Sequence, residues 1–405
     1  MLHKDLLDEA RALQGEIVAL RRAIHAEPEL GLQTPKTRDK VRTALADLPL
    51  DWIEGPATTG IVATLKGGAG PGRCVLLRGD MDALPMPEET GLDYASTVPG
   101  TMHACGHDTH TAMLAGAVRL LCDRREMLRG EVRFMFQPGE EGFHGARFML
   151  EDGLLGGAGT GRNLPEAAFA LHVMPNAQHG LVAGRAGALM ASADQFDITV
   201  TGRGGHAAMP HYALDPVPIA CEIVLAIQTM VARQFDAHDP VIATIARIEG
   251  GTAHNVIADF AILRGTLRTL SARHRAKLHA ALEQLAMGIA AAHGANASVA
   301  ITPGFPVTHC DPRAVALGEA VTHDLFGKAA FRRLDAPIMG AEDFSYVLEQ
   351  IPGAMFFLGV AADGADWHTC PAIHSPRMTV DESALPRGAA LLAGCAVRFL
   401  EQGWD

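Results

Sequence analysis

The sequence has no excess of basic residues. Its 34 lysines and arginines are outnumbered by 46 aspartates and glutamates, which gives a formal net charge of −12. Nucleic acids and anionic membranes bind basic surfaces, so we expect neither among the partners of this chain. The sequence also shows no run of about 18 apolar residues of the kind that spans a bilayer. Its first nine residues carry acids where a signal peptide is apolar.

Cysteines are few and irregularly spaced. The seven in the chain do not form the framework of a disulfide-stabilised secreted domain, and an odd number suits a reducing compartment. We therefore expect a cytoplasmic protein. Cys74, Cys122, Cys221 and Cys395 are expected to be small buried hydrophobic residues. Cys105 differs because it lies between two histidines in a glycine-containing loop.

The order of apolar segments predicts an α/β fold. A chain of 405 residues is longer than one compact core accommodates, which suggests two domains. Residues 74–78, 131–136 and 167–171 are short apolar runs of the buried-strand type, and residues 109–122 form an expected helix. Polar residues follow each of the three strands. In open α/β sheets, ligands bind at this edge.

The pattern changes in the middle of the chain. The expected elements there follow the order β-α-β-β-α-β of a ferredoxin-like unit. We predict an inserted α+β domain at residues 187–300, and a catalytic domain with a mixed sheet flanked by helices from residues 1–186 and 301–405. The elements that define the insertion are strands 195–201, 241–248, 256–269 and 298–302 and helices 215–233 and 271–293.

Four loops carry side chains that suit a metal centre. They are residues 103–108, 137–142, 171–173 and 373–375, and they supply a thiolate, imidazoles and carboxylates. A divalent pair such as zinc or manganese prefers ligands of these types. Neighbouring side chains of an extended segment point opposite ways, so one glutamate of the 137–142 loop can face a metal and the other a water molecule. The loops predict a metal-dependent hydrolase.

A second interpretation makes Cys105 a nucleophile activated by His107. It leaves Glu140, Glu141, His172 and His374 without a role. Taken singly, His172 is expected to be a core histidine and His374 a surface residue, and only the complete set indicates a metal site. Asp80 and Asp82 lie on one side of an extended strand end, where they are able to orient a ligand or supply another carboxylate.

Eight segments in order resemble the dinuclear-metal amidohydrolases and aminoacylase metallopeptidases. The resemblance extends over residues 21–400 and is strongest to the branch of hippurate hydrolase and the indole-acetyl-amino-acid hydrolases. The segments are residues 78–85, 102–108, 137–142, 171–173, 204–207, 250–257, 340–345 and 374–377.

The resemblance implies two divalent metal ions per subunit, zinc or manganese first, with cobalt or nickel as alternatives. It implies that Glu140 is the general base and that Asp82 orients the site. The metal ligands that it implies are Cys105, His107, Glu141, His172 and His374.

The resemblance also implies that the insertion is a lid or dimerisation domain, and hence a homodimer or higher homo-oligomer. There, His206 matches a histidine that steadies the oxyanion, often in the partner subunit's active site. Asn255 and Arg268 match positions associated with the substrate's carbonyl or carboxylate. On structural grounds alone, residues 204–205 read as a strand bulge and Arg268 as a surface charge of the sheet.

The activity implied is hydrolysis of the amide bond of N-acyl-L-amino acids with aromatic or acetyl acyl groups. Bulkier aromatic amides, such as phenylalanine-linked toxins, are an alternative. A dipeptidase or carboxypeptidase with the same centre, and a non-catalytic binding protein on this fold, also remain open. The sequence departs from the family at His254, Ile373 and residues 378–379, positions that bear on the shape of the substrate pocket.

Overall fold

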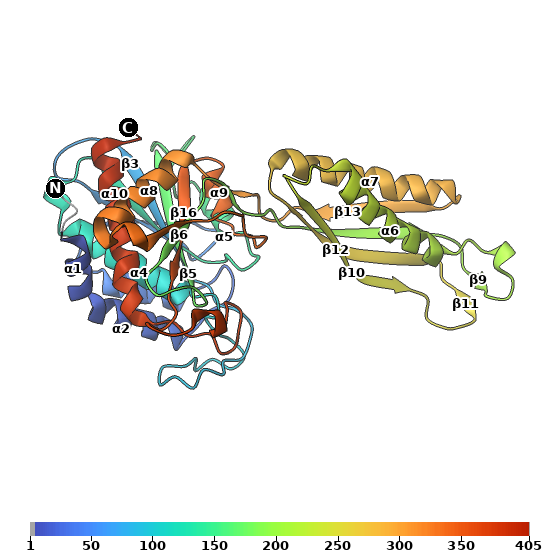
Figure 1. The fold of residues 1–405 in the computed structure, drawn as a ribbon, viewed down its shortest axis with the longest axis horizontal. Helices are drawn as coiled ribbons and strands as arrows, with labels where there is room; N and C mark the ends of the chain where they lie inside the picture. The colour runs from blue at the N-terminus through green and yellow to red at the C-terminus, as the bar shows by residue number, and fades with distance from the viewer. Residues whose placement is uncertain (1–4, 405) are drawn as a thin grey trace. The chain divides into compact units, whose positions relative to one another are not determined.

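Four parallel strands form the centre of the larger sheet (Figure 1). They are β3 (Cys74–Asp80), β4 (Glu131–Gln137), β5 (Ala167–Met174) and β16 (Gly353–Gly359), and they are buried along nearly their whole length in the computed structural model. Strands covered on both faces need continuous apolar sequence, which these runs provide. Because the strands are parallel, their carboxyl ends meet at one edge of the sheet.

The structure describes residues 5–404, so residues 1–4 of the acidic N-terminal stretch lie outside the described residues. The larger sheet has eight strands in the order β1-β2-β4-β3-β5-β16-β6-β15, and its outer strands include antiparallel pairs. This mixed sheet confirms the predicted α/β class. Its outer strands are β1 (Asp51–Glu54), β2 (Ile61–Lys66), β6 (Val182–Gly184) and β15 (Phe331–Arg333).

Helix α4 (His107–Cys122) packs against β3 and is also in contact with α2 (Gln14–His25) and α10 (Leu385–Gln402). Its residues are buried almost without exception, which explains why the helix has no polar face. The remaining helices of this part are α1 (Leu6–Ala12), α3 (Pro35–Ala44), α5 (Gly145–Glu151), α8 (Pro312–Phe326) and α9 (Ser345–Leu348).

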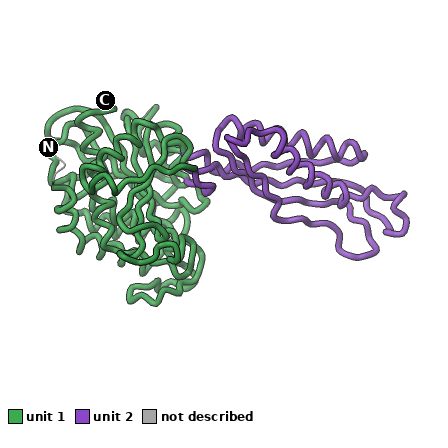
Figure 2. The backbone as a smooth tube through the Cα atoms, viewed as in Figure 1, with its two compact units in different colours: residues 1–189, 309–336, 343–405 green, residues 190–308, 337–342 purple. Residues whose placement is uncertain are grey.

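The chain divides into two compact units (Figure 2). Unit 1 comprises Met1–Leu189, His309–Ala336 and Asp343–Asp405, and unit 2 comprises Met190–Thr308 and Pro337–Glu342. Unit 2 overlaps the segment 187–300 expected from the sequence. It also takes in residues 301–308, which the prediction assigned to the catalytic domain, and residues 337–342, which the sequence did not indicate.

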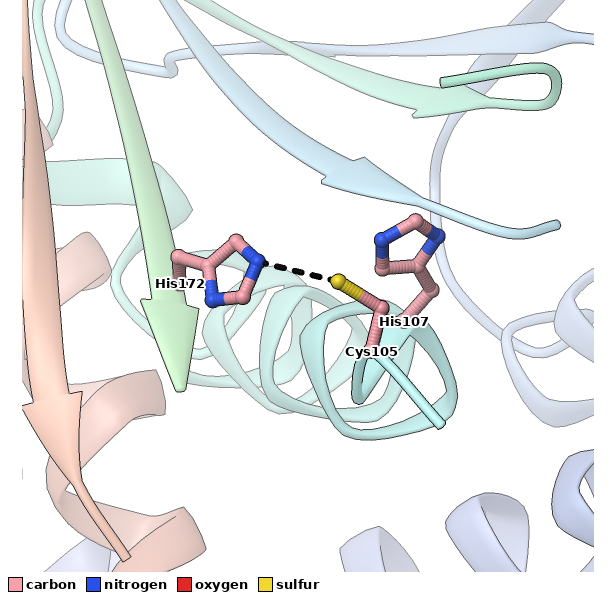
Figure 3. A group of neighbouring side chains, drawn as sticks. All are labelled: Cys105, His107 and His172. Atoms are coloured by element: carbon pink, nitrogen blue, oxygen red, sulfur yellow. Dashed lines mark hydrogen bonds between the residues drawn. The ribbon is translucent and has the colours of Figure 1, made fainter. Parts of the chain in front are cut away.

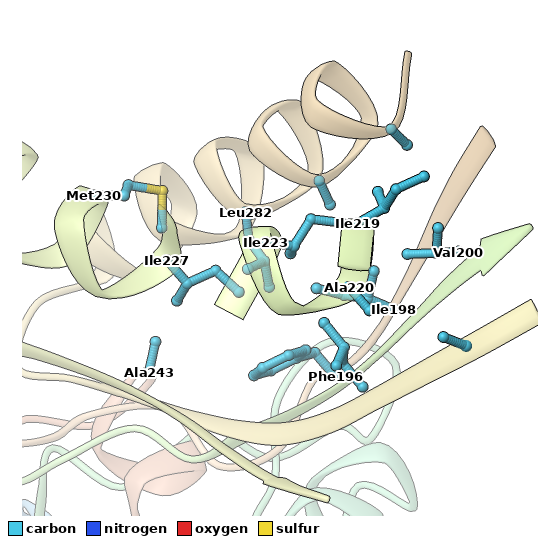
Figure 4. Close-up of a cluster of buried hydrophobic side chains, with 14 of the residues drawn as sticks. Phe196, Ile198, Val200, Ile219, Ala220, Ile223, Ile227, Met230, Ala243 and Leu282 are labelled. Atoms are coloured by element: carbon cyan, nitrogen blue, oxygen red, sulfur yellow. The ribbon is translucent and has the colours of Figure 1, made fainter. Parts of the chain in front are cut away.

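Unit 2 has the predicted ferredoxin-like order. Four antiparallel strands lie in the order β10-β12-β8-β13, and two helices contribute to their common core (Figure 4). In β8, buried and exposed residues alternate, as expected for a sheet with one covered face. The elements are β8 (Asp194–Thr201), α6 (Pro216–Gln234), β10 (Val241–Gly250), β12 (Phe260–Thr269), α7 (Ala272–Ala292) and β13 (Asn296–Thr302), with β9 (Gly205–His206) and β11 (Val256–Ile257) as a separate two-stranded pair.

The two helices of unit 2 begin at capping residues. The Asp215 side chain accepts a hydrogen bond from the Val217 backbone, and Pro216 occupies the first helical position of α6. The Ser271 side chain accepts from the His274 backbone at the start of α7. These local signals fix both helix starts within one residue of the sequence prediction.

Helix α6 overturns one expectation. Among the described residues it is the one helix long and apolar enough to cross a membrane, by length and composition alone. The prediction that no such segment exists is therefore wrong on those two criteria. One side of α6, including Ile219, Ile223 and Ile227, forms the core of unit 2, which accounts for part of its apolar composition.

Some boundaries also differ from prediction. The periodic apolar residues from Leu6 to Ile24 predict a single opening helix, but the structure has two helices, α1 and α2, that meet at Leu13. The expected strand 256–269 is divided into β11 and β12 because Val256 pairs with β9 whereas Phe260 onward pairs with β8 and β10. His172 lies inside β5 and not beyond its end.

Candidate metal centre

The loop that carries Cys105 and His107 turns sharply into α4. Gly106 has φ +91°, and a Cβ at this position would lie 2.4 Å from Val173 Cγ2. A positive φ is costly for residues with a side chain, and here the space is also filled. Glycine therefore allows Cys105 and His107 to flank a tight turn packed against the end of β5.

Cys105, His107 and His172 converge from the start of α4 and from β5 (Figure 3). One potential ligand atom from each lies within 4.8 Å of the others, and all three residues are buried. Cys105 Sγ is 3.4 Å from His172 Nε2. The structure thus brings together three of the predicted ligands from segments 67 residues apart.

The two remaining predicted ligands lie next to this group. Cys105, Glu141 and His374 form a second cluster by the same distance criterion, and His107, Glu140 and Glu141 form a third. Cys105 and His107 each belong to more than one cluster. A donor set of this extent accommodates two neighbouring cations more readily than one.

Unpaired buried atoms fit the presence of a cation. Among the described residues, neither ring nitrogen of His107 has a hydrogen-bond partner, and neither does Glu141 Oε1. Buried polar atoms are rarely left without a partner. A divalent cation would satisfy Glu141 Oε1 and one ring nitrogen of His107, since a neutral imidazole offers a single lone pair to a metal. Burial raises the pKa of the Cys105 thiol to about 12, so a metal ion is needed to hold it as the thiolate ligand.

His172 is held in the form that binds metal. Its Nδ1 donates to the carbonyl oxygen of Val173 at 2.7 Å, which leaves Nε2 as the nitrogen that faces Cys105. Burial lowers the pKa of His172 well below its ordinary value, which keeps the ring neutral. A neutral imidazole with one nitrogen already bonded is a preoriented ligand.

Asp82 fixes the loop that carries the two glutamates. Its Oδ1 accepts from the Glu140 backbone N–H and its Oδ2 from the Glu141 backbone N–H, both at 3.0 Å. Asp82 Oδ1 is also 3.4 Å from His107 Nδ1. The side chain of Asp82, buried after β3, therefore connects the glutamate loop to the Cys-His loop.

His374 is the exposed ligand candidate. Its φ is +64°, an uncommon conformation for a residue with a side chain. The backbone N–H of His374 donates to the Ala104 carbonyl at 2.6 Å, and its Nε2 lies 3.3 Å from Glu141 Oε1. Strain of this kind concentrates at functional sites, where surrounding contacts compensate for it.

His206, Asn255 and Arg268 lie in unit 2. His206 is in β9, where its Nδ1 accepts from the Ala208 backbone, and the Asn255 carbonyl accepts from the Ala207 backbone. Arg268 is a half-buried residue of β12. His206 and Asn255 are thus neighbours on an exposed two-stranded segment. Their role at the metal centre stays a prediction.

A buried polar network that the sequence did not predict lies at the same edge of the sheet. Arg78 donates to Asp80, Gln137 and Asp343, and Asp80 is 2.7 Å from His110 Nδ1. Burial alone would raise the pKa of Asp80, but the charge of Arg78, together with the His107 and His110 rings, overcomes it and holds that pKa well below its ordinary value. The sequence held one signal for this network, since His110 follows His107 by one helical turn.

A cluster of buried thiol, imidazole and carboxylate groups, with a further glutamate beside it and at the carboxyl edge of a mixed α/β sheet, defines a metal-dependent hydrolase. The sequence model of peptidase family M20/M25/M40 matches residues 76–398, and the chain belongs to that family. Its members include dinuclear metal peptidases and amidohydrolases, and this chain is an enzyme of that class. The cysteine-nucleophile interpretation therefore loses its support.

Similar proteins come from plants and bacteria. The chain is 38% identical over 390 residues to the IAA-amino acid hydrolase ILR1-like 2 of Arabidopsis thaliana, covering 95% of this chain and 85% of that protein. It is 37% identical to the N-acetylcysteine deacetylase of Bacillus subtilis, covering 96% and 98%. A solved Bacillus subtilis structure, described as a dinuclear metal-binding peptidase of the M20 family, superposes with a TM-score of 0.81 at 34% identity and covers 96% and 99% of the two chains.

Proposed function

We propose that this chain hydrolyses the amide bond of N-acyl-L-amino acids and releases a carboxylic acid and a free amino acid. The observation that carries the proposal is the pair Glu140–Glu141. Asp82 holds both backbone amides of the pair, beside a cluster of thiol and imidazole ligands. One carboxylate is then available to bind metal while its neighbour transfers protons.

Two bound divalent cations supply electrophilic chemistry: they polarise the scissile carbonyl and lower the pKa of a water molecule towards ~7. Glu140 accepts a proton from the attacking water as the new C–O bond forms. It returns that proton to the amide nitrogen as the C–N bond breaks, so the amine leaves neutral. Glu140 is buried, and one carboxylate oxygen is 3.9 Å from His107 Nε2, within the cluster it would serve.

Residues of unit 2 complete the proposal. We assign His206 to the oxyanion, where a fixed donor is most effective. Arg268 suits a substrate carboxylate because a guanidinium matches its geometry, and Asn255 suits the carbonyl. Loss of the His206 side chain should lower turnover more than metal content. A His206→Ala variant that instead loses metal would make His206 a ligand.

The names of the relatives support small amide substrates. One relative is named for IAA-amino acids and another for N-acetylcysteine, both of them N-acyl amino acids. The family name and the solved structure also refer to peptidases, so a dipeptidase or carboxypeptidase is the second candidate. The non-catalytic candidate is disfavoured because the sequence retains every predicted ligand and the base.

The test is hydrolysis of a panel containing hippurate, N-acetyl amino acids, a bulky phenylalanine amide and free dipeptides. The enzyme is assayed as purified, after chelation, and after addition of manganese, zinc, cobalt or nickel. Chelator-sensitive activity on the N-acyl amino acids supports the proposal. Preference for dipeptides supports the peptidase. Activity that survives chelation but is lost on alkylation of Cys105 would overturn both.

We further propose a homodimer formed through unit 2. β10 is at one end of the four-stranded sheet, and Ile242 and Ile248 of this strand are exposed. Leu225 of the adjacent helix α6 is 71% exposed. A long edge strand with apolar side chains pairs readily with another strand, and a second copy offers the same strand and helix.

Light scattering tests the dimer. The wild-type chain should have twice its own mass of 42.8 kDa. Leu225→Glu combined with Ile248→Lys should give the single mass, whereas Met127→Glu, an exposed apolar residue of unit 1, should not change the assembly. A double variant that keeps the wild-type mass contradicts this interface.

We also propose that the enzyme is cytoplasmic, where a reducing environment protects the sulfur of Cys105 from oxidation.

A further inference from the structure

We propose that His110 is a positioning residue that holds the β5 backbone from which His172 faces the metal centre. His110 lies in α4, one turn beyond His107, and is 2% exposed. Its ring is 4.6 Å from that of His172, measured between centroids. By residue type and location His110 resembles a further metal ligand, but its contacts assign it another role.

Both ring nitrogens of His110 are already engaged. The Val173 backbone N–H donates to Nε2 at 2.9 Å. A backbone amide only donates, so Nε2 must accept and the ring proton must be on Nδ1, which donates to Asp80 Oδ1 at 2.7 Å. Asp80, His107 and His110 also have ligand atoms within 4.8 Å of one another. His110 nevertheless has no lone pair left for a cation.

The bond to Val173 replaces a missing strand partner. Pairing between β3 and β5 ends at Arg78 and Ala170. Beyond that point, the Val173 N–H is bonded to the side chain of His110 and the Val173 carbonyl accepts from His172 Nδ1. The position of Val173 therefore sets the direction of the His172 ring. Bonds of this kind to a ligand's surroundings fix its orientation and tune its affinity for metal.

Asp80, which accepts the hydrogen bond from His110 Nδ1, is itself held in place. Asp80 Oδ2 accepts from Arg78 Nη1 at 2.6 Å, and Arg78 Nη2 donates to Asp343 Oδ1 at 3.0 Å. All three side chains are at most 1% exposed. The guanidinium of Arg78 keeps the carboxylate of Asp80 directed at the His110 ring. The chain Arg78–Asp80–His110–Val173 thus connects β3, α4 and β5 behind the metal centre.

Two substitutions test the two hydrogen bonds of His110 one at a time. His110→Asn keeps a donor near the position of Nδ1, which preserves the contact with Asp80 but removes the acceptor for Val173. His110→Gln places an amide oxygen near the position of Nε2 and keeps that acceptor. The chelated protein is titrated with Co²⁺ alone, and the thiolate-to-cobalt absorption band and the affinity from competition with a chelator are recorded.

We expect His110→Asn to weaken cobalt binding by roughly 10- to 100-fold and to shift the absorption band. His110→Gln should recover most of the affinity and the wild-type band, and both variants should bind as many equivalents as wild type at saturation. The control is Val321→Ala, which truncates a buried side chain of α8 outside the metal centre. It should lower the urea midpoint without changing the cobalt affinity.

Three results would overturn the proposal. The first is wild-type cobalt affinity and an unshifted band in His110→Asn. The second is saturation at one equivalent fewer than wild type, which would make His110 a ligand. The third is a fall in cobalt affinity in Val321→Ala as large as that in His110→Asn, which would attribute the effect to general destabilisation. Because the readout is metal binding, none of these results depends on the substrate.

Discussion

A buried ion network in unit 1 predicts that the chain loses stability as the pH rises above neutral. His25, the last residue of α2, is 1% exposed. Its Nδ1 lies 2.8 Å from Asp108 Oδ2 and its Nε2 3.2 Å from Glu88 Oε1. Two carboxylate partners require both nitrogens to donate, which is the protonated form of the ring.

Burial alone would lower the pKa of His25, but the charge of Asp108 and hydrogen bonds to Asp108 and Glu88 overcome it and raise the pKa from 6.5 to about 9. A raised pKa in the folded state means that the folded chain binds more protons than the unfolded chain between these two values. The stabilisation is therefore complete below pH 6.5 and is lost as the pH rises through about 9. The shift corresponds to about 3 kcal/mol.

Urea unfolding between pH 6 and 9 measures this loss. All three tryptophans, Trp52, Trp367 and Trp404, belong to unit 1, so their fluorescence reports on the unit that contains His25. A chelator is present throughout because metal affinity itself depends on pH. Readings stop at pH 9 because burial raises the pKa of thiols such as Cys395 far above its ordinary value, and these thiols add a loss of the same sign once unfolded thiols ionise.

The matched variant is His25→Gln. It should be less stable than wild type by about 3 kcal/mol at pH 6, and this difference should shrink steadily until the two proteins converge near pH 9. If His25→Gln and wild type lose stability with the same slope between pH 6.5 and 9, the assignment of the proton to His25 is refuted.

Further predictions concern the metal centre. Glu140→Gln should keep its metal content by elemental analysis and lose about 10²- to 10⁴-fold in kcat, and a near-normal rate would exclude Glu140 as the base. Gly106→Ala should lower the free energy of unfolding by at least about 1–2 kcal/mol and weaken metal binding, because its φ is +91° and Val173 fills the space. Gly288 lies inside α7, where an added Cβ would meet no neighbouring atom within 4 Å, so Gly288→Ala should instead stabilise the chain by about 0.5–1 kcal/mol. Metal addition should raise the Tm of the chelated protein, and a Tm indifferent to every cation would contradict a site formed in the folded state.

Much of the site could be predicted because its ligands lie in short, distinctive segments. Residues 103–108 and 137–142 hold a thiol, imidazoles and paired glutamates in loops between apolar strands. Parallel strands bring such loops to one edge, and the structure places Cys105, His107 and His172 together there. The sequence did not show that His172 lies inside β5, because a strand buried on both faces has no polar residues to mark its end.

The supporting network could not be predicted, since its contacts join distant segments. Arg78 bonds Asp343 across 265 residues, and His25 bonds Asp108 across 83. Each of these side chains, taken alone, is an ordinary charged residue with an expected place in solvent. Only the packing of strands and helices shows that the partners are within hydrogen-bond distance.

By itself, the sequence determined the elements of this protein and the chemistry of its loops, because periodicity, capping residues and ligand types are local properties. It also determined the ferredoxin-like order of unit 2. The tertiary structure alone decided which buried charges are paired, which histidine nitrogen faces the centre, and that His110 supports the site from behind. These depend on long-range strand pairing, such as β5 with β16, which no local pattern records.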